Sequence, residues 1–396
     1  MTILNRRSFM IGTAAVASAL NVRGANDRIR LGIIGTGSRG WYLMRNVIGD
    51  VEWVAVCDAW DQRREEAARN VGGKVRKYAD YRQLLDQKDI DAVIVATWDN
   101  NHAPITIDAC KAGKDVFVEK PMTAQPAEGL AIVKTVRETK RVVQVGMQQR
   151  SIPHFIEAKQ KVFDSGLIGD VHMVRTYWNA NTGYLETPPP GMEQKPAGLD
   201  WDACLGSLPK IPWDPKRFFN RFAYWDQSTG GQTGGLFVHL VDVVHWFLNL
   251  QAPSKAVAMG GIYQYNDGRD TPDNINAILE YPNRLNVTFE ATITDLIPKQ
   301  AVDILFFGTG GRLSIFRDQY TFTPAEKNKK LGVIEGSEPS ETAHLTNWLE
   351  CIRTRKTPNA DAVAGHYSSM ACHIVNMAYR QKVPVAWQKE WDVPTT

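Results

Sequence analysis

Short apolar segments alternate with helical segments over residues 27–150, and this alternation constrains the fold more than any other feature of the chain. Between the first two apolar segments, Trp41, Met44, Val47 and Ile48 recur at the spacing of one helical face. Strands that alternate with helices build a parallel sheet, so this region is predicted to form a doubly wound α/β domain. The expected strands are 29–34, 51–57, 75–78, 92–97, 116–119 and 142–146.

The pattern changes after Arg150, where one helix is expected at 155–165 and longer strands follow. Loops rather than crossover helices join these strands, so residues 151–396 are predicted to form an α+β domain with a large, mainly antiparallel sheet. Its expected strands are 171–178, 256–265, 276–281, 286–294 and 302–307, its closing helices are 344–355 and 361–380, and a loop-rich insert covers roughly 180–230.

Residues 1–26 resemble a targeting segment rather than part of the fold. Arg6 and Arg7 precede Phe9 and the apolar, small-residue run 11–20, which is the pattern of a twin-arginine export signal. We therefore expect export to the periplasm, with a frayed cytosolic N-terminus as the alternative. Beyond this segment, no apolar run is long enough to span a bilayer.

Charge and cysteine content exclude several classes of partner and site. The 396 residues carry a formal net charge of +3 and no basic stripe, which argues against nucleic acid as a partner. The five cysteines are widely spaced without a Cys-x-x-Cys pair, so we interpret them as small buried hydrophobic residues. No cluster has sensible metal-ligand spacing, and no metal is expected.

Residues 35–40 read Gly-Thr-Gly-Ser-Arg-Gly and match the pattern G-x-G-x-x-G between an expected strand and an expected helix. In this context Gly35 permits a tight turn, Gly37 lets the backbone approach a pyrophosphate, and Gly40 allows close helix packing. The helix N-terminus, which starts near Ser38, attracts phosphate. The first domain is therefore predicted to be a dinucleotide-binding Rossmann domain.

Asp58 ends the second strand, where a carboxylate accepts hydrogen bonds from an adenosine ribose and repels a 2′-phosphate. This residue favours NAD as the cofactor. Arg39, Arg63 and Arg64 leave NADP as the alternative.

Glu119-Lys120-Pro121 follows the apolar strand that begins at Asp115. This strand end belongs to the carboxyl edge of the predicted sheet, where ligands of open α/β sheets bind. The position brings a lysine to the place where a substrate would meet a nicotinamide ring.

The motifs at 35–40, 97–104, 119–121 and 144–146 together resemble the glucose-fructose oxidoreductase / inositol dehydrogenase / rhizopine-catabolism (Gfo/Idh/MocA) family, from about residue 29 onward. The resemblance implies a nicotinamide coenzyme on the first domain and a second domain whose open-faced sheet shapes a site for sugars, cyclitols or their derivatives. Trp98 stands where relatives usually have proline. The expected coenzyme contacts are Gly35, Gly37, Ser38, Arg39, Gly40, Asp58, Thr97, Asn100, His102, Glu119, Lys120 and Gln148.

The resemblance also implies that Lys120 touches both the nicotinamide and a substrate hydroxyl, where a cation stabilises a developing alkoxide and relays a proton. Pro121 is expected to set a rigid turn, with a cis bond as one form. His239 is expected to act as an acid or base, with a core histidine that caps the helix as the alternative. It matches a family histidine that acts with an aspartate four residues earlier, but this chain has Gly235 at that position. Asp242, three residues later, is expected to orient His239 instead.

Further substrate contacts are weaker expectations. Arg150 either binds substrate oxygens or forms an interdomain ion pair. The segment 177–226 is rich in aromatic residues, which pack well on the C–H faces of sugars, and Trp225 is the one we assign to the substrate beside Lys120, Arg150 and His239.

Three functions remain open on this basis. The first is an exported, NAD-dependent oxidoreductase acting on a carbohydrate or polyol hydroxyl. The second is a redox-neutral glycosidase, lyase or epimerase that works through a transient keto-sugar with tightly bound NAD. The third is a non-catalytic, dinucleotide-dependent sugar-binding protein. An open sheet face needs covering, so a homodimer or tetramer is also expected.

Overall fold

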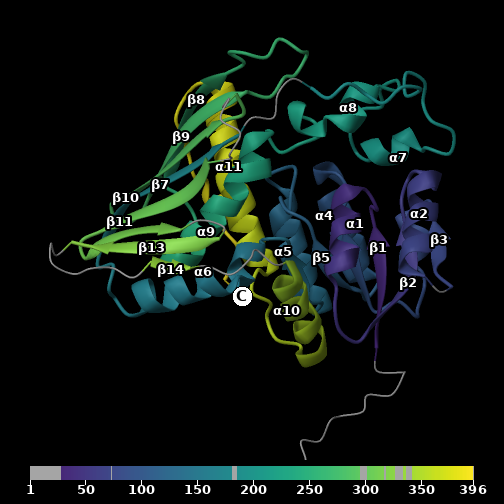
Figure 1. The fold of residues 1–396 in the computed structure, drawn as a ribbon, viewed down its shortest axis with the longest axis horizontal. Helices are drawn as coiled ribbons and strands as arrows, with labels where there is room; N and C mark the ends of the chain where they lie inside the picture. The colour runs from purple at the N-terminus through teal and green to yellow at the C-terminus, as the bar shows by residue number, and fades with distance from the viewer. Residues whose placement is uncertain are drawn as a thin grey trace, which may run out of the picture.

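The computed structural model describes residues 28–72, 74–180, 185–294, 301–315, 318–325, 333–335 and 341–395. The expected export signal lies outside these residues. Two sheets make up the molecule, one at each side of Figure 1. No helix in the described ranges has both the length and the apolar character needed to cross a membrane.

The first sheet contains six parallel strands in the order β3-β2-β1-β4-β5-β6, which confirms the predicted doubly wound fold. Strands β4 and β5 are buried along their whole length because helices cover both faces. The strands are β1 (Ile29–Ile34), β2 (Val51–Cys57), β3 (Arg76–Tyr78), β4 (Ala92–Val95), β5 (Asp115–Val118) and β6 (Val143–Val145), and the helices are α1 (Ser38–Asn46), α2 (Asp61–Val71), α3 (Tyr81–Leu85), α4 (Asp99–Lys111) and α5 (Glu128–Thr139).

One helix from the far end of the chain completes this first layer. Helix α10 (Glu341–Thr354) buries Leu345, Trp348 and Leu349 in the cluster that contains Phe117 of β5. The Trp348 and Phe117 ring centroids lie 5.8 Å apart. The range 27–150 therefore does not contain every element that packs on the first sheet.

The second sheet has nine strands in the order β14-β13-β12-β11-β7-β10-β9-β8-β15, and only the β7–β10 pair among the described strands is parallel. The burial of β9 and β10 alternates along each strand, as expected for a sheet with one covered face. The strands are β7 (Val171–Asn179), β8 (Lys255–Gly261), β9 (Asn274–Tyr281), β10 (Leu285–Thr292), β11 (Ala301–Gly308), β12 (Gly311–Ile315), β13 (Gln319–Pro324), β14 (Val333–Glu335) and β15 (Val385–Ala386).

Helices α9 (Val238–Leu248) and α11 (Ala362–Gln381) fill the space between the two sheets. Helix α11 packs on α5 and β6 of the first layer and on β8 of the second. Helix α9 is apolar around most of its surface and almost fully buried, as its central position requires. At its start, Phe237 stacks on Phe289 of β10 with ring centroids 4.5 Å apart.

The described part of the insert contains the short helices α7 (Trp201–Leu205) and α8 (Pro215–Phe219) and the helical turn 221–223. Aspartate caps start both helices: Asp200 accepts from the backbone N–H of Ala203, and Asp214 accepts from that of Arg217. These elements lie above the carboxyl edge of the first sheet in Figure 1. The insert is thus ordered around two capped helices rather than being a simple loop.

Candidate active site

A cavity of about 1090 Å³ extends from the loop 35–40 to Lys120. The carboxyl edge of the first sheet forms its floor, and the insert forms its opposite wall. Ligand sites of open α/β sheets lie at this edge, because the strand order reverses there between β1 and β4.

Gly35 and Gly40 of the phosphate loop suit a dinucleotide site, because side chains at these two positions would clash with neighbouring backbone. Gly35 has φ +92°, and a Cβ there would lie 2.6 Å from the carbonyl oxygen of Ala96. A Cβ on Gly40 would lie 2.0 Å from the carbonyl oxygen of Gly35. Helix α1 begins after Gly37 without a side-chain cap, so its first N–H groups remain for a pyrophosphate.

Asp58 lines the cavity at the end of β2, as predicted. Its carboxylate accepts hydrogen bonds from the backbone N–H of Thr36 at 2.7 Å and of Trp60 at 2.9 Å, which hold it in place. Arg63 also lines the cavity beside Gly37, and its guanidinium lies over the Trp60 ring at 5.3 Å. Arg64 instead donates to the carbonyl oxygen of Asp58 at 2.6 Å.

Arg39 joins the phosphate loop to the strand end that carries Lys120. Its guanidinium contacts Glu119 and Glu341 at 2.7 Å each, and both carboxylates are buried. The two carboxylates hold the pKa of Arg39 above its ordinary value even though burial lowers it. Arg39 and Glu119 both line the cavity, but they also form an ion pair that fixes the start of the Lys120 turn.

His102 connects two turns at the sheet edge. Its Nδ1 lies 2.8 Å from the carbonyl oxygen of Pro121, and its Nε2 lies 3.1 Å from that of Thr97. The Lys120–Pro121 bond is cis. His102 and Thr97 both line the cavity, and their contacts with the coenzyme stay predictions.

Two other expected coenzyme contacts point elsewhere. Asn100 donates its side-chain N–H to the carbonyl oxygen of Leu205 at 2.7 Å and so holds the insert, while its neighbour Asn101 lines the cavity. Gln148 lies outside the cavity wall, and its buried Oε1 has no hydrogen-bond partner within the described part of the chain.

Lys120 is half-buried at the end of the cavity and donates from Nζ to the carbonyl oxygen of Gly235 at 2.7 Å. The pKa of Lys120 is lowered from 10.5 to about 8, mainly by burial and to a smaller extent by nearby Arg221, while Glu119 and Asp99 oppose the shift. The lysine is thus held by the backbone carbonyl of Gly235, the position at which relatives often have an aspartate.

His239 is buried on α9, with Nδ1 3.2 Å from Oε1 of Gln149 and its ring 6.1 Å from that of Trp178. The expectation that Asp242 orients it is wrong. Both oxygens of Asp242 accept from Arg150, at 2.8 and 2.9 Å, and Ser368 donates to the same carboxylate at 2.9 Å. The guanidinium of Arg150 binds both carboxylate oxygens of Asp242 in a bidentate geometry, so Asp242 pairs with Arg150 rather than with His239.

Two residues that were expected to contact the substrate, Arg150 and Trp225, make other contacts in the structure. Arg150 joins the end of the first domain to α9 and to the carbonyl oxygen of Asn359, which is the interdomain alternative rather than substrate binding. Trp225 lies outside the cavity wall: its Nε1 donates to the carbonyl oxygen of Asp270, and its ring stacks on Tyr379 at 5.8 Å. The exposed aromatic residue beside Lys120 is Phe222.

The insert closes over the first domain through aromatic rings and backbone hydrogen bonds. Asp200 donates its N–H to the carbonyl oxygen of Ala59 at 2.9 Å, and Asp61 donates to that of Gly198 at 3.0 Å. The Trp201 ring lies 5.7 Å from that of Trp98. The buried cluster of this contact consists of Trp60, Leu199, Trp201, Leu205 and Phe218.

Two family models match the sequence. One, described as an oxidoreductase family with an NAD-binding Rossmann fold, matches residues 29–147, and the other, the GFO/IDH/MocA C-terminal domain, matches residues 210–314. Together they cover more than half of the chain. The chain belongs to the Gfo/Idh/MocA oxidoreductase family. Its first domain is an NAD-binding Rossmann domain, and the predicted cofactor is confirmed.

Relatives of this Gfo/Idh/MocA protein include cyclitol dehydrogenases. Inositol 2-dehydrogenase of Salmonella typhimurium is 33% identical over 159 residues, which are 39% of this chain and 47% of that protein. The scyllo-inositol 2-dehydrogenase (NAD(+)) of Bacillus subtilis is 35% identical over 146 residues, which are 36% of this chain and 42% of that protein. The chain therefore aligns with less than half the length of these curated relatives.

A solved structure extends the likeness to the whole fold. The WlbA dehydrogenase of Bordetella pertussis, in complex with NADH and UDP-GlcNAcA, has a TM-score of 0.70 at 19% identity, over 91% of this chain and 99% of that one. Both domains of this Gfo/Idh/MocA member thus have the fold of that dehydrogenase.

Sequence reasoning missed several residues that line this Gfo/Idh/MocA site, three of which lie near predicted contacts or on the insert. Asn101, Arg221 and Phe222 line the cavity, and the last two come from the insert. The signal that was available for Arg221 and Phe222 is their place in an aromatic-rich segment, which indicates the segment but not the residue. All five cysteines are free thiols; four are buried as predicted, whereas Cys204 is only half-buried.

Proposed function

We propose that the chain oxidises a hydroxyl group of a carbohydrate or polyol, with NAD as the hydride acceptor. The observation that carries this proposal is Lys120, which lines the same cavity as the phosphate loop. Relatives named as inositol dehydrogenases and a fold neighbour in complex with a nucleotide sugar support the choice of substrate class.

The bound nicotinamide supplies the hydride acceptor, and the chain's own residues manage the proton. Neutral Lys120 accepts the proton of the substrate hydroxyl while a hydride leaves the same carbon, so that the alcohol becomes a carbonyl and Lys120 becomes an ammonium. Its pKa of about 8 is suited to this exchange near neutral pH. Gly235 keeps the amino group in position throughout, since its carbonyl oxygen accepts from either protonation state.

His239 is the less suitable proton acceptor of the two candidates. It is buried and is not among the residues that line the cavity. We assign His239 a positioning role. Its helix α9 directly follows the helical turn 233–237, which contains Gly235, the residue that holds Lys120.

A redox-neutral reaction is the second candidate, and the insert favours it. In this reaction Lys120 helps to oxidise a sugar carbon, the carbonyl acidifies the neighbouring C–H, elimination or epimerisation follows, and the hydride returns to the sugar. A coenzyme under the insert would exchange slowly, which suits a reaction that regenerates it at each turnover. Export to the periplasm, which the N-terminal motif predicts, would also favour a reaction that regenerates its bound coenzyme, because little free NAD is available there.

Chemical analysis of the purified chain separates these functions. After denaturation, released NAD is measured by absorbance, and the native protein is then supplied with mixed sugars, cyclitols and glycosides. Net NADH formation supports the dehydrogenase. Product without net NADH, with solvent deuterium in the sugar, supports the redox-neutral enzyme. Sugar binding without any turnover would contradict both and favour a binding protein.

Export has its own test. A variant with Arg6→Lys and Arg7→Lys should remain in the cytoplasmic fraction, whereas the wild-type chain should reach the periplasmic fraction. Equal cytoplasmic retention of both chains would contradict the expected localisation without affecting the proposed reaction.

A further inference from the structure

The turn Arg221–Ala223 of the insert brings Arg221 and Phe222 to the catalytic end of the cavity. Neither residue belongs to the phosphate loop or is Asp58, where the pyrophosphate and the adenosine ribose are expected, so the coenzyme site leaves their function open. Their surroundings are those of a ligand-binding surface, here named the Arg221–Phe222 edge.

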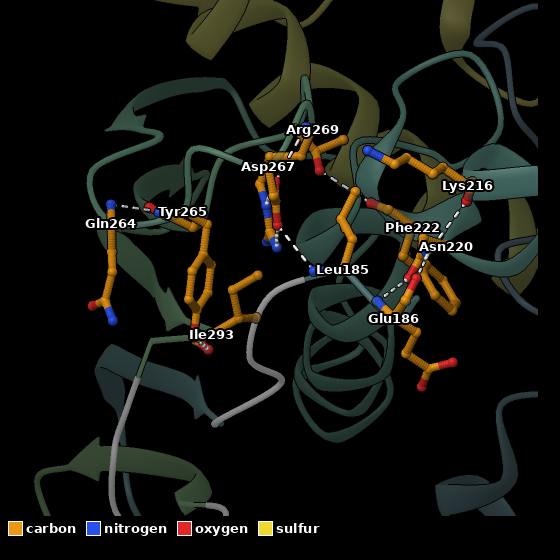
Figure 2. A network of polar contacts seen from close by, with 12 residues as sticks. Leu185, Glu186, Lys216, Asn220, Phe222, Gln264, Tyr265, Asp267, Arg269 and Ile293 are labelled. Atoms are coloured by element: carbon orange, nitrogen blue, oxygen red, sulfur yellow. Dashed lines mark hydrogen bonds and ion pairs between the residues drawn. The ribbon is translucent and has the colours of Figure 1, made fainter. Parts of the chain in front are cut away.

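The backbone of this turn is held by side chains before any ligand binds (Figure 2). Phe222 accepts at its carbonyl oxygen from Oγ1 of Thr271 at 3.0 Å. The Asn220 side chain accepts from the N–H of Glu186 at 2.8 Å and donates to its carbonyl oxygen at 3.1 Å. Next to it, Leu185 donates its N–H to Asp267 at 3.0 Å. The edge is therefore preorganised.

Arg221 is anchored at one nitrogen only. Its Nη1 donates to Oδ1 of buried Asp99 at 2.9 Å, while Oδ2 of Asp99 accepts from the backbone N–H and the hydroxyl of Thr229. Nε and Nη2 of Arg221 have no acceptor within the described ranges. A guanidinium presents its donors in a planar fork that suits two adjacent oxygen atoms.

Phe222 is exposed at 46% of its surface, although it lies beside the catalytic lysine. A Cβ on residue 235 would lie 3.3 Å from Cε1 of this ring, so the ring occupies the space next to Gly235. The carbonyl oxygen of the same glycine accepts from Lys120. The ring and the lysine thus both lie next to Gly235. The Arg221 guanidinium lies over one face of the ring, 4.1 Å from its centroid, so a ligand meets the part of the ring that Arg221 leaves exposed.

We propose that the Arg221–Phe222 edge is the substrate subsite that selects a six-membered sugar or cyclitol ring. The C–H groups of the ligand ring pack on the part of Phe222 that Arg221 leaves exposed. Two adjacent ring oxygens accept from Nε and Nη2 of Arg221 beside it, which directs a neighbouring hydroxyl to Lys120. Gly235 keeps room for the aromatic ring. This inference rests on the proposed function, since it names what the oxidised hydroxyl belongs to.

Steady-state kinetics at saturating NAD test the subsite with myo-inositol and glucose as ring probes and glycerol as an open-chain probe. Arg221→Lys should raise the KM for the better ring probe about ten- to hundredfold, the range expected for losing hydrogen bonds to a charged donor. Phe222→Leu should raise it about two- to tenfold, the range expected for losing an aromatic face. Their kcat should fall less than about threefold, because Lys120 is untouched. NAD affinity, measured by calorimetry, should not change.

Arg217→Lys is the matched control. Arg217 lies on the same insert, pairs with Asp226 at 2.7 Å and stands over the Tyr224 ring at 4.4 Å, but it does not line the cavity. Its kinetics should equal those of the wild type.

The outcomes separate the subsite from the reaction. If the wild type oxidises a ring probe but both edge variants keep its KM, the subsite is refuted and the proposed function stands. A loss of NAD affinity in the edge variants, or a preference of the wild type for glycerol, would also overturn the subsite. If the wild type turns over neither these probes nor any sugar of the mixed panel, the proposed function fails, and the subsite fails with it.

Discussion

At the scale of single residues, Lys120 lies between the carbonyl oxygen of Gly235 and the coenzyme cavity. Lys120→Ala should lower kcat for sugar oxidation by about 10²- to 10⁴-fold, the usual contribution of a positioned acid or base. NAD affinity should change little, because the pyrophosphate and the adenosine ribose are expected to bind at residues 35–40 and Asp58 rather than at this side chain. Lys111→Ala, at an exposed lysine in the last turn of α4, is the control and should leave kcat unchanged.

The pH dependence of the reaction follows from the lowered pKa of Lys120. Because the pKa is about 8, most of the amino group is protonated at neutral pH and cannot accept a proton. The value of kcat/KM for oxidation should therefore rise with pH, about tenfold per unit below the pKa, and level off above it. A profile that stays flat between about pH 6 and 9 would argue against Lys120 as the proton acceptor.

The sequence predicts some of these residues and not others, for a physical reason. Gly35, Asp58 and Lys120 occupy fixed positions relative to strand ends, and local pattern is enough to place them. The partner of Asp242 is different, because Arg150 lies 92 positions away in sequence and reaches it only through the tertiary fold. Helical spacing alone indicated that Asp242 would orient His239, and this is why that expectation failed.

At the scale of elements, the insert acts as a cover held by the Trp201 cluster. Trp201→Ala removes a buried ring from this contact, and such truncations cost about 3 kcal/mol or more. We therefore expect NAD to dissociate at least about tenfold faster, as measured by stopped-flow fluorescence.

Trp225→Ala is the control for this prediction, since Trp225 belongs to the same insert but stacks on Tyr379 outside the cavity. Its release rate should match the wild type. Equal rates for Trp201→Ala and the wild type would show that the insert does not retain the coenzyme.

The elements were predictable where periodicity was strong. Strands β1 and β2 and the closing helices α10 and α11 lie within a few residues of their expected positions. Strands β12 to β15 were not expected, because they are short and their pairing depends on partners across the sheet. The insert was expected as a loop, since its helices have only five residues each and depend on capping and tertiary contact.

At the scale of the whole molecule, the Arg150–Asp242 pair joins the two domains. The side chains are only 12% and 1% exposed, so removing one partner leaves a buried charge. Arg150→Met should lower the free energy of unfolding by about 3 to 5 kcal/mol in denaturant titrations. Arg175→Met, which breaks the exposed pair with Glu290, should lower it by less than about 1 kcal/mol. Similar losses for both variants would contradict this role.

The domain arrangement was predictable only in part. The change from alternating strands and helices to long strands indicates two sheets, but it gives no sign that α10 returns to the first one. That contact joins the apolar face of α10, containing Leu345 and Trp348, to buried Phe117. No local sequence pattern shows that these two distant segments meet. The expected homo-oligomer remains a prediction that the open sheet face motivates.

A crystal structure of the chain with NAD tests the central claim most directly. The account predicts the pyrophosphate at residues 35–40, the adenosine ribose at Asp58 and the nicotinamide next to Lys120, under the insert. A coenzyme bound outside this cavity, or a nicotinamide turned away from Lys120, would contradict it.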